Sequence, residues 1–222
     1  MKTLICSATS LELSGIFPSI SSSEIKTAGS GFEKEGISFL VTGIGVLNSY
    51  SSLVQFHLNT PVDRVLQIGI AGAYAGAREE VKVLGTPVII RREVVADLGA
   101  EDSDSFLSLN DLDLGELEYY ESKNLNIFYD LFGDSLKPLP IVTGATVNTA
   151  TGKEATGIIR AEKYDVEVES MEGAGALKFG QDFGIPVLQI RSISNIATTR
   201  NRDIWDIIGA IKSLRNLCGA VL

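Results

Sequence analysis

Two glutamates of this sequence follow short apolar segments that we expect to be buried strands. Glu12 comes after residues 3–8, and Glu172 comes after residues 166–168, within Met171-Glu172-Gly173-Ala174. Ligands of open α/β sheets bind beyond the carboxyl ends of the strands, so both carboxylates are placed for acid–base work on a ligand. Each glutamate could instead cap a helix or complement its dipole, and the sequence leaves that alternative open.

A third polar stretch, Arg191-Ser192-Ile193-Ser194-Asn195, ends the apolar segment 186–194 and is placed to contact a ligand, although Ser and Asn also favour turns.

The sequence gives little support to metal-dependent chemistry or to a catalytic nucleophile. The single histidine, His57, forms no Cys/His ligand set and no catalytic pair, so we expect it to be structural or exposed. Neither Gly43-x-Gly45 nor Gly173-x-Gly175 completes G-x-G-x-x-G, so we expect no metal and no cofactor.

The composition is typical of a globular protein, with 45% hydrophobic and 21% charged residues in 222 positions, and we expect one domain over residues 1–222. A net charge of −9 without a Lys/Arg cluster argues against nucleic acid and membrane surfaces as partners and leaves a small molecule. Cys6 and Cys218 give no disulfide framework, and Cys6 is expected in the core. No apolar run approaches the ~18 residues of a membrane span, so we expect a cytoplasmic protein.

Strand-like and helix-like segments alternate along the chain, which predicts an α/β fold with a mostly parallel or mixed central sheet and helices on both faces. The predicted strands are residues 3–8, 24–28, 37–42, 65–70, 83–90, 141–144, 166–168 and 186–194. Predicted helices are a first helix from Thr9-Ser10-Leu11-Glu12, then residues 46–58, 152–164, 172–183 and 203–217. The last helix should have one apolar side, made of Ile204, Ile207, Ile208, Ile211, Leu214 and Leu217. The acidic residues 97–123 are interpreted as a loop or lid.

Four motifs in order carry a family resemblance: Gly43-Ile44-Gly45, Gly69-Ile70-Ala71-Gly72, Met171-Glu172-Gly173-Ala174 and Ser192-Ile193-Ser194-Asn195. Together they resemble the nucleoside phosphorylase and nucleosidase superfamily over most of the chain. Within it, Arg191-Ser192-Ile193-Ser194-Asn195 followed by Arg200-Asn201-Arg202-Asp203 and Trp205 is similar to the futalosine hydrolase family. The resemblance implies a nucleoside phosphorylase-like fold and a homo-oligomer. It also implies hydrolysis of futalosine to hypoxanthine and dehypoxanthinyl futalosine, in a route to menaquinone.

The same resemblance implies roles for individual residues. In the related methylthioadenosine/S-adenosylhomocysteine nucleosidases, the motif glutamate contacts the ribose hydroxyls, which corresponds to Glu172 here, and Met171 would lie against the sugar. Glu12 matches the position of the glutamate that activates water. The segment Thr146-Val147-Asn148 matches the purine-contacting segment, with Val147 where adenine-specific relatives carry an aromatic residue. The other predicted substrate contacts are Ile70, Ala71 and Gly72.

Asn195 departs from the adenine-cleaving nucleosidases, which carry an aspartate there to protonate N7 and accept from the 6-amino group. An amide can donate to a 6-oxo group while its oxygen accepts from N7–H, which suits hypoxanthine and leaves solvent as the source of the proton. Arg200 and Arg202 are candidates for holding the carboxylate of futalosine, because a guanidinium can donate two parallel hydrogen bonds. Alternatively they are solvated or pair with Asp203 or Asp206.

Three rival interpretations stay open. A phosphorylase would need an arginine-lined anion pocket near the glycine-rich loops. Residues 43–51 contain no Arg or Lys, which favours water as the nucleophile. Arg78, Arg91 and Arg92 could still line an anion pocket, so the phosphorylase stays open. A nucleosidase of the methylthioadenosine type is a further alternative. A non-catalytic nucleoside-binding module could share the fold, and the presence of both Glu12 and Glu172 argues against it.

Overall fold

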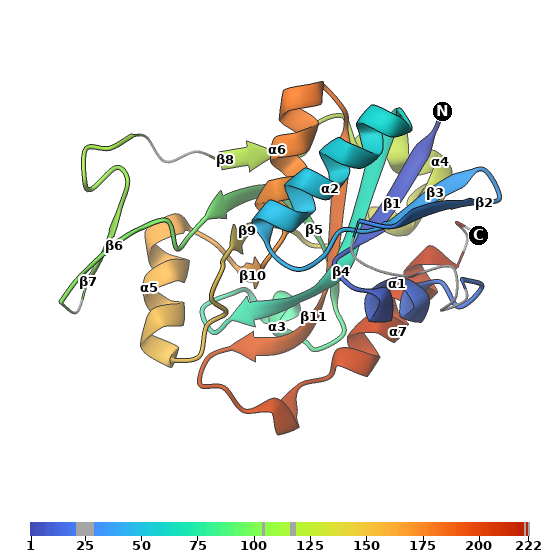
Figure 1. The fold of residues 1–222 in the computed structure, drawn as a ribbon. Helices are drawn as coiled ribbons and strands as arrows, with labels where there is room; N and C mark the ends of the chain where they lie inside the picture. Colours follow the sequence, from blue (N-terminus) through green and yellow to red (C-terminus); the bar gives the residue numbers. More distant parts are fainter. Residues whose placement is uncertain (21–28, 104, 116–118, 220, 222) are drawn as a thin grey trace.

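A mixed sheet forms the centre of the computed structural model, which describes residues 1–20, 29–103, 105–115, 119–219 and 221 (Figure 1). Among these residues the sheet has nine strands in the order β10-β9-β5-β11-β4-β1-β3-β2, with β8 paired to β5. The strands are β1 (Thr3–Ser7), β2 (Gly31–Lys34), β3 (Ile37–Val41), β4 (Arg64–Tyr74), β5 (Pro87–Val95), β8 (Tyr119–Glu121), β9 (Ile141–Thr146), β10 (Val168–Ser170) and β11 (Val187–Ala197). Because β10 pairs with both β9 and β4, strands β4, β11, β5, β9 and β10 close into a ring.

Helices cover both faces of this sheet, which confirms the predicted α/β architecture. They are α1 (Ser10–Ile16), α2 (Val46–Asn59), α3 (Glu79–Lys82), α4 (Tyr129–Phe132), α5 (Glu154–Tyr164), α6 (Gly173–Phe183) and α7 (Ile207–Cys218), with 3-10 helices η1 (Leu125–Phe128), η2 (Gly133–Leu136) and η3 (Arg202–Ile204). Helices α2 and α6 lie side by side over one face, and α1 and α7 over the other (Figure 1).

The alternation of side chains along β1 explains why helices are needed on both faces. Ile5 packs with Leu13 of α1 and Leu214 of α7, whereas Leu4 packs on the opposite side with Leu53 of α2. Successive residues of a strand point to opposite faces, so a continuous apolar segment must be covered twice. Cys6, two residues after Leu4 and on the same face of the strand, is buried in the same cluster, as predicted.

Several strands differ from their predicted bounds. β4 and β11 run on to Tyr74 and Ala197, so the glycine-rich and Ser-Asn stretches expected to end them lie inside the sheet. β10 lies two residues later than predicted. The predicted strand 24–28 lies outside the described residues. β2 was not predicted, because its side chains alternate between exposed and half-buried at the sheet edge and form no apolar segment.

The segment 97–123 is more ordered than a simple loop. It contains a two-stranded hairpin, β6 (Gly99–Asp102) and β7 (Ser105–Ser108), which extends away from the body, and then β8 (Figure 1). The last helix also starts later than predicted, at Ile207. Ile204 and Ile208 are exposed, so the prediction was wrong for both, and the buried side of α7 is formed by Ala210, Ile211, Leu214 and Cys218. No helix within the described residues is both long enough and apolar enough to cross a bilayer.

Candidate active site

A pocket of about 380 Å³ lies at the edge of the sheet where β1 and β10 end and holds most of the predicted site residues. Its volume falls within the roughly 300–1,000 Å³ of small-molecule sites. The predicted residues that line it are Glu12, Ile70, Ala71, Gly72, Val147, Met171, Glu172, Asn195 and Arg200. Ile44, Trp205 and Ile207 add apolar surface. The pocket therefore combines two carboxylates with an apolar wall.

Glu12 both caps α1 and lines the pocket, so its structural and functional interpretations are compatible. Thr9 is the N-cap of the helix. Its N–H and Oγ1 donate to Glu12 Oε2 at 3.0 and 2.7 Å, and Glu12 N–H donates back to Thr9 Oγ1. The other carboxylate oxygen, Oε1, accepts from Ile70 N–H at 3.1 Å. Burial raises the pKa of Glu12 above its ordinary value, partly offset by the charge of Arg191 and the bond from Thr9. A carboxyl held in this way is suited to take up a proton.

Gly69 in the middle of β4 lets two charged groups approach each other. A Cβ atom at this position would lie 2.6 Å from Glu12 Oε1 and 2.7 Å from Arg191 Nη1. Glu12 comes from the helix after β1, and Arg191 from β11, the strands on either side of β4. A side chain at position 69 would push the two groups apart, so the glycine is required by close approach rather than by a turn.

Glu172 precedes α6 but its side chain does not cap that helix. Its Oε1 accepts from Gly45 N–H at 3.2 Å and its Oε2 from Arg191 Nη1 at 3.4 Å. Gly45 has a φ of +96°, a conformation that favours glycine, and this directs its N–H at the carboxylate. The carboxylate is thus held from two sides and lines the pocket beside Met171. The capping alternative for Glu172 is not supported.

Asn195 reaches the pocket through an irregularity of β11. The register with β4 shifts between Ile193, opposite Ala71, and Asn195, opposite Gly72. Such a bulge redirects the side chains beside it. Ser194 Oγ donates to Asn195 Oδ1 at 2.9 Å, and a Cβ at Gly72 would lie only 3.0 Å from Asn195 Nδ2. The amide nitrogen therefore lies over the glycine, and Asn195 lines the pocket.

Three predicted contact residues lie outside the pocket lining. Thr146 is fully buried, where its hydroxyl donates to Glu93, and Asn148 is exposed, with its side-chain amide donating to Asp97. Arg202 is exposed on η3. Of residues 146–148, for which the resemblance implies purine contacts, Val147 alone lines the pocket, because neighbouring residues at a strand end point in opposite directions.

Arg200 and Trp205 form a unit at the mouth of the pocket. The Arg200 guanidinium carbon lies 5.0 Å from the centre of the Trp205 ring, and both residues line the pocket. A guanidinium over an aromatic face is attracted to it and keeps its edge donors available. Arg200 is therefore placed to meet an anionic group of a ligand, whereas Arg202 is not.

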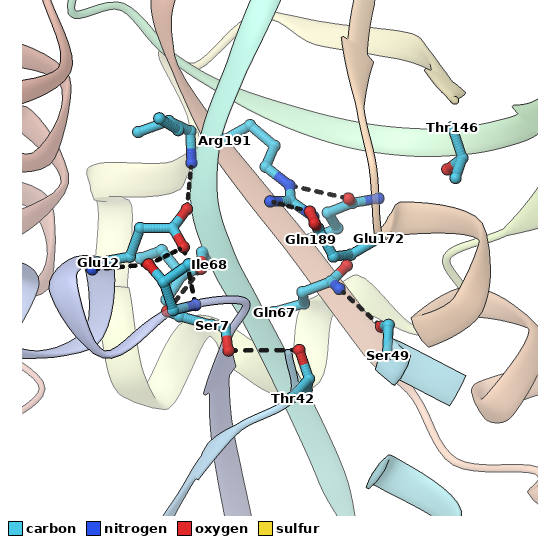
Figure 2. A network of polar contacts seen from close by, with 12 residues as sticks. Ser7, Glu12, Thr42, Ser49, Gln67, Ile68, Thr146, Glu172, Gln189 and Arg191 are labelled. Carbon is cyan, nitrogen blue, oxygen red and sulfur yellow. Dashed lines mark hydrogen bonds and ion pairs between the residues drawn. The ribbon is translucent and has the colours of Figure 1, made fainter. Parts of the chain in front are cut away.

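Arg191 is the main site residue to which sequence reasoning assigned no role. It is 1% exposed, its Nε donates to Gln189 Oε1 at 3.1 Å, and its Nη1 reaches Glu172 (Figure 2). Its Nη2 has no hydrogen-bond partner among the described residues. A buried arginine must be paired, and the paired carboxylate here lines the pocket. The available signal was an arginine inside a predicted buried strand, residues 186–194.

The remaining candidates lie elsewhere. Arg78, Arg91 and Arg92 line a separate pocket with Thr143, and Arg78 pairs with Glu167 at 2.7 Å. His57 accepts from Val62 N–H at 3.2 Å and packs against two phenylalanines, so it is structural as predicted. Within the described ranges, no group of three potential metal ligands occurs.

A model of the phosphorylase superfamily matches residues 30–222. The chain therefore belongs to the phosphorylase superfamily. It is 29% identical over 186 residues to futalosine hydrolase of Thermus thermophilus, covering 83% of this chain and 80% of the relative. It is also 29% identical over 229 residues to futalosine hydrolase of Streptomyces coelicolor, covering 99% and 94%.

Solved structures agree on the fold. A futalosine hydrolase mutant of Helicobacter pylori superposes with a TM-score of 0.79 at 18% identity, covering 100% of this chain and 98% of that one. The 5'-methylthioadenosine/S-adenosylhomocysteine nucleosidase of the same organism superposes with a TM-score of 0.76 at 16% identity, covering 100% and 97%. The predicted nucleoside phosphorylase-like fold is confirmed.

Proposed function

We propose that this protein hydrolyses the N-glycosidic bond of futalosine and releases hypoxanthine and dehypoxanthinyl futalosine, as a step of menaquinone biosynthesis. The observation that carries the proposal is one pocket that brings together Glu12, Glu172 and the amide of Asn195. One carboxylate can activate water and the other can bind the sugar, while the amide can bind the base. The similarity to futalosine hydrolases over most of the chain supports this choice of substrate.

Glu172 has the acceptor capacity to hold two neighbouring hydroxyls. A carboxylate offers about four acceptor positions, two on each oxygen. Gly45 N–H uses one position on Oε1 and Arg191 Nη1 uses one on Oε2. One position remains on each oxygen, which suits the 2′ and 3′ hydroxyls of a ribose. The charge of the carboxylate also favours the oxocarbenium-like sugar of the transition state.

Glu12 acts as the base that activates water. Thr9 fills the acceptor positions of Oε2, and Ile70 N–H fills one on Oε1, so one position on Oε1 remains for a water molecule. As the C1′–N9 bond breaks, the water oxygen bonds to C1′ and one of its protons passes to Glu12. The departing base takes a proton at N7 from solvent, so charge and atoms balance.

Asn195 selects a 6-oxopurine. Its Nδ2, which lies over Gly72, presents donors that fit the 6-oxo group and repel a 6-amino group. Asn195→Asp replaces these donors with acceptors. We expect the ratio of kcat/KM for inosine to that for adenosine to fall about tenfold or more, as for one hydrogen bond of 1–3 kcal/mol. Parallel kinetics on both nucleosides measure this, and an unchanged ratio would exclude the role.

Arg200 binds the carboxylate at the far end of futalosine. Arg200→Ala should lower kcat/KM for futalosine about tenfold, a modest value because the side chain is exposed, and should leave inosine, which lacks the carboxylate, nearly unaffected. Arg202→Ala is the matched control, since Arg202 lies outside the pocket, and it should change neither rate. Equal losses on both substrates in Arg200→Ala would assign the residue to the fold instead.

Water rather than phosphate is the proposed nucleophile. Arg191 is the buried cation next to the carboxylates, and Glu172 already pairs with it, while Arg78, Arg91 and Arg92 line another pocket. The test is to follow futalosine cleavage with and without inorganic phosphate and to analyse the sugar product. We expect equal rates and a free sugar. A phosphate-dependent rate with a sugar 1-phosphate product would make the protein a phosphorylase.

We further propose that the protein is a cytoplasmic homo-oligomer. Cys6 and Cys218 are both free and buried, which suits a reducing compartment. Leu11 and Ile44 at the pocket are exposed, as are Leu47 and Ile208 on the neighbouring helices. Exposed apolar side chains gathered near one site are typical of an interface, and a second copy of the chain would cover them.

A further inference from the structure

Glu93 is a buried carboxylate to which the proposed reaction gives no role. It lies on β5 with 1% of its surface exposed, and it does not line the pocket. Its Oε2 accepts from Thr146 Oγ1 at 2.7 Å and its Oε1 from Gln189 Nε2 at 3.1 Å. Burial raises the pKa of Glu93 to about 7, against the lowering effect of these bonds and of Arg191. Burying a carboxyl costs free energy of desolvation, so its place in the core calls for a physical reason.

The backbone around Glu93 is shaped to admit it. A Cβ at Gly144 would lie 2.7 Å from Glu93 Oε1, and one at Gly173 would lie 2.0 Å from the same oxygen. Gly173 directly follows Glu172 and opens α6. The first residue of that helix is therefore packed against the Glu93 carboxylate, and no larger residue would fit there.

One chain of hydrogen bonds runs from Glu93 to Glu172 through Arg191. The amide nitrogen of Gln189 donates a hydrogen bond to Glu93. The amide oxygen of Gln189 therefore faces Arg191 and accepts from its Nε at 3.1 Å. Arg191 in turn donates from Nη1 to Glu172 Oε2 (Figure 2). An acceptor at position 93 thus orients the Gln189 amide, and the amide orients the guanidinium.

A second chain reaches the backbone beside Glu172. The Thr146 hydroxyl donates to Glu93, which directs its lone pairs at Ala174 N–H, 2.7 Å away. Ala174 lies two residues after Glu172, in the first turn of α6. The two chains leave different oxygens of the Glu93 carboxylate. One ends at the Glu172 side chain, and the other ends at the backbone N–H of Ala174, two residues after Glu172.

We propose that Glu93 is a positioning residue that sets the orientation of the Glu172 carboxylate toward the ribose hydroxyls. It makes and breaks no bond in the reaction, and it acts only through Gln189 with Arg191 and through Thr146. The proposal rests on the proposed function, in which Glu172 holds those hydroxyls. Removal of the Glu93 carboxylate should therefore weaken the contribution of the ribose hydroxyls to kcat/KM more than it weakens binding of the base.

The test compares inosine with 2′-deoxyinosine in the wild type, Glu93→Ala and Glu93→Gln. Loss of the acceptor in Glu93→Ala should lower kcat/KM for inosine about 10- to 100-fold and 2′-deoxyinosine much less, so that discrimination between them shrinks. Glu93→Gln retains an acceptor for Gln189, so it should keep most of the wild-type discrimination between the two nucleosides. In a Glu172→Gln background, Glu93→Ala should add little, because residues acting through one group are not additive.

A purely structural role predicts a different result. Glu93→Ala would then lower the rates on both nucleosides by the same factor, with a lower Tm, and this outcome would overturn the proposal. If Glu93→Ala does not fold, Thr146→Val breaks only the second chain at nearly constant shape and should still reduce discrimination; unchanged discrimination there would also overturn it. If the wild type cleaves no purine nucleoside, the proposed function fails instead, so the two failures are distinguishable.

Discussion

Glu172→Gln should lower kcat/KM for futalosine by about 30- to 1,000-fold, which corresponds to roughly 2–4 kcal/mol of transition-state stabilisation. The glutamine keeps the size of the side chain but loses the charge and one acceptor position for the ribose. It also leaves Arg191, buried beside it, without its carboxylate partner. Because both hydroxyl contacts and charge act on the sugar, we expect the largest loss in the step in which the oxocarbenium-like sugar forms.

The measurement is steady-state kinetics with inosine and its 2′-deoxy and 3′-deoxy analogues. Wild-type protein should discriminate strongly against both analogues, and Glu172→Gln should not. Glu154→Gln, on the exposed first turn of α5, is the matched control for loss of one carboxylate and should behave as wild type. If wild type and Glu172→Gln discriminate equally, Glu172 does not hold the hydroxyls.

Glu12→Gln should lower kcat by about 10²- to 10⁴-fold while substrate binding is retained, because a general base typically contributes that much. Glutamine can still accept from Thr9, so the capping arrangement at the start of α1 is expected to survive. Thr9→Ala provides the complementary control. It removes the cap at a cost of about 1 kcal/mol in stability but keeps the carboxylate, so its kcat should fall far less.

The pH profile gives a second test of Glu12. A base must be ionised to accept a proton, and burial raises the pKa of this carboxyl. Activity should therefore be lost as the pH falls through the raised pKa, so the acid limb of kcat should lie above the usual range of a glutamate. Glu12→Gln should have no such limb. A near-normal kcat in this variant, or an unchanged limb, would contradict the assignment.

The two carboxylates could be placed from the sequence because strand ends are visible in it. Both glutamates follow short apolar segments, and the ends of parallel strands gather at one edge of a sheet. The sequence could not show that Gly69 serves close approach within β4, or that Asn195 follows a bulge within β11. Gly, Ser and Asn mark turns far more often than such interior sites, so the predicted strands ended too early.

The buried polar network behind the pocket could not be predicted. Glu93 and Gln189 lie 96 positions apart, and their contact depends on the pairing of β5 with β11. Thr146 was predicted to contact the ligand because Thr146-Val147-Asn148 matches the purine-contacting segment of related nucleosidases, but strand alternation turns its side chain toward Glu93. Asn148 was assigned in the same way, and Asp97 holds it at the surface. Motif positions thus indicate the neighbourhood of a site, and the pleat of the strand decides which residues face it.

The most direct measurement is the release of free base from futalosine, inosine and methylthioadenosine by the purified protein in phosphate-free buffer, with Glu172→Gln in parallel. The account predicts the highest kcat/KM for hypoxanthine release from futalosine, which uses Asn195, Glu172 and Arg200 together. It predicts less from inosine, which lacks the carboxylate, and little adenine from methylthioadenosine. Preferential release of adenine, or no hypoxanthine from futalosine, would contradict the account.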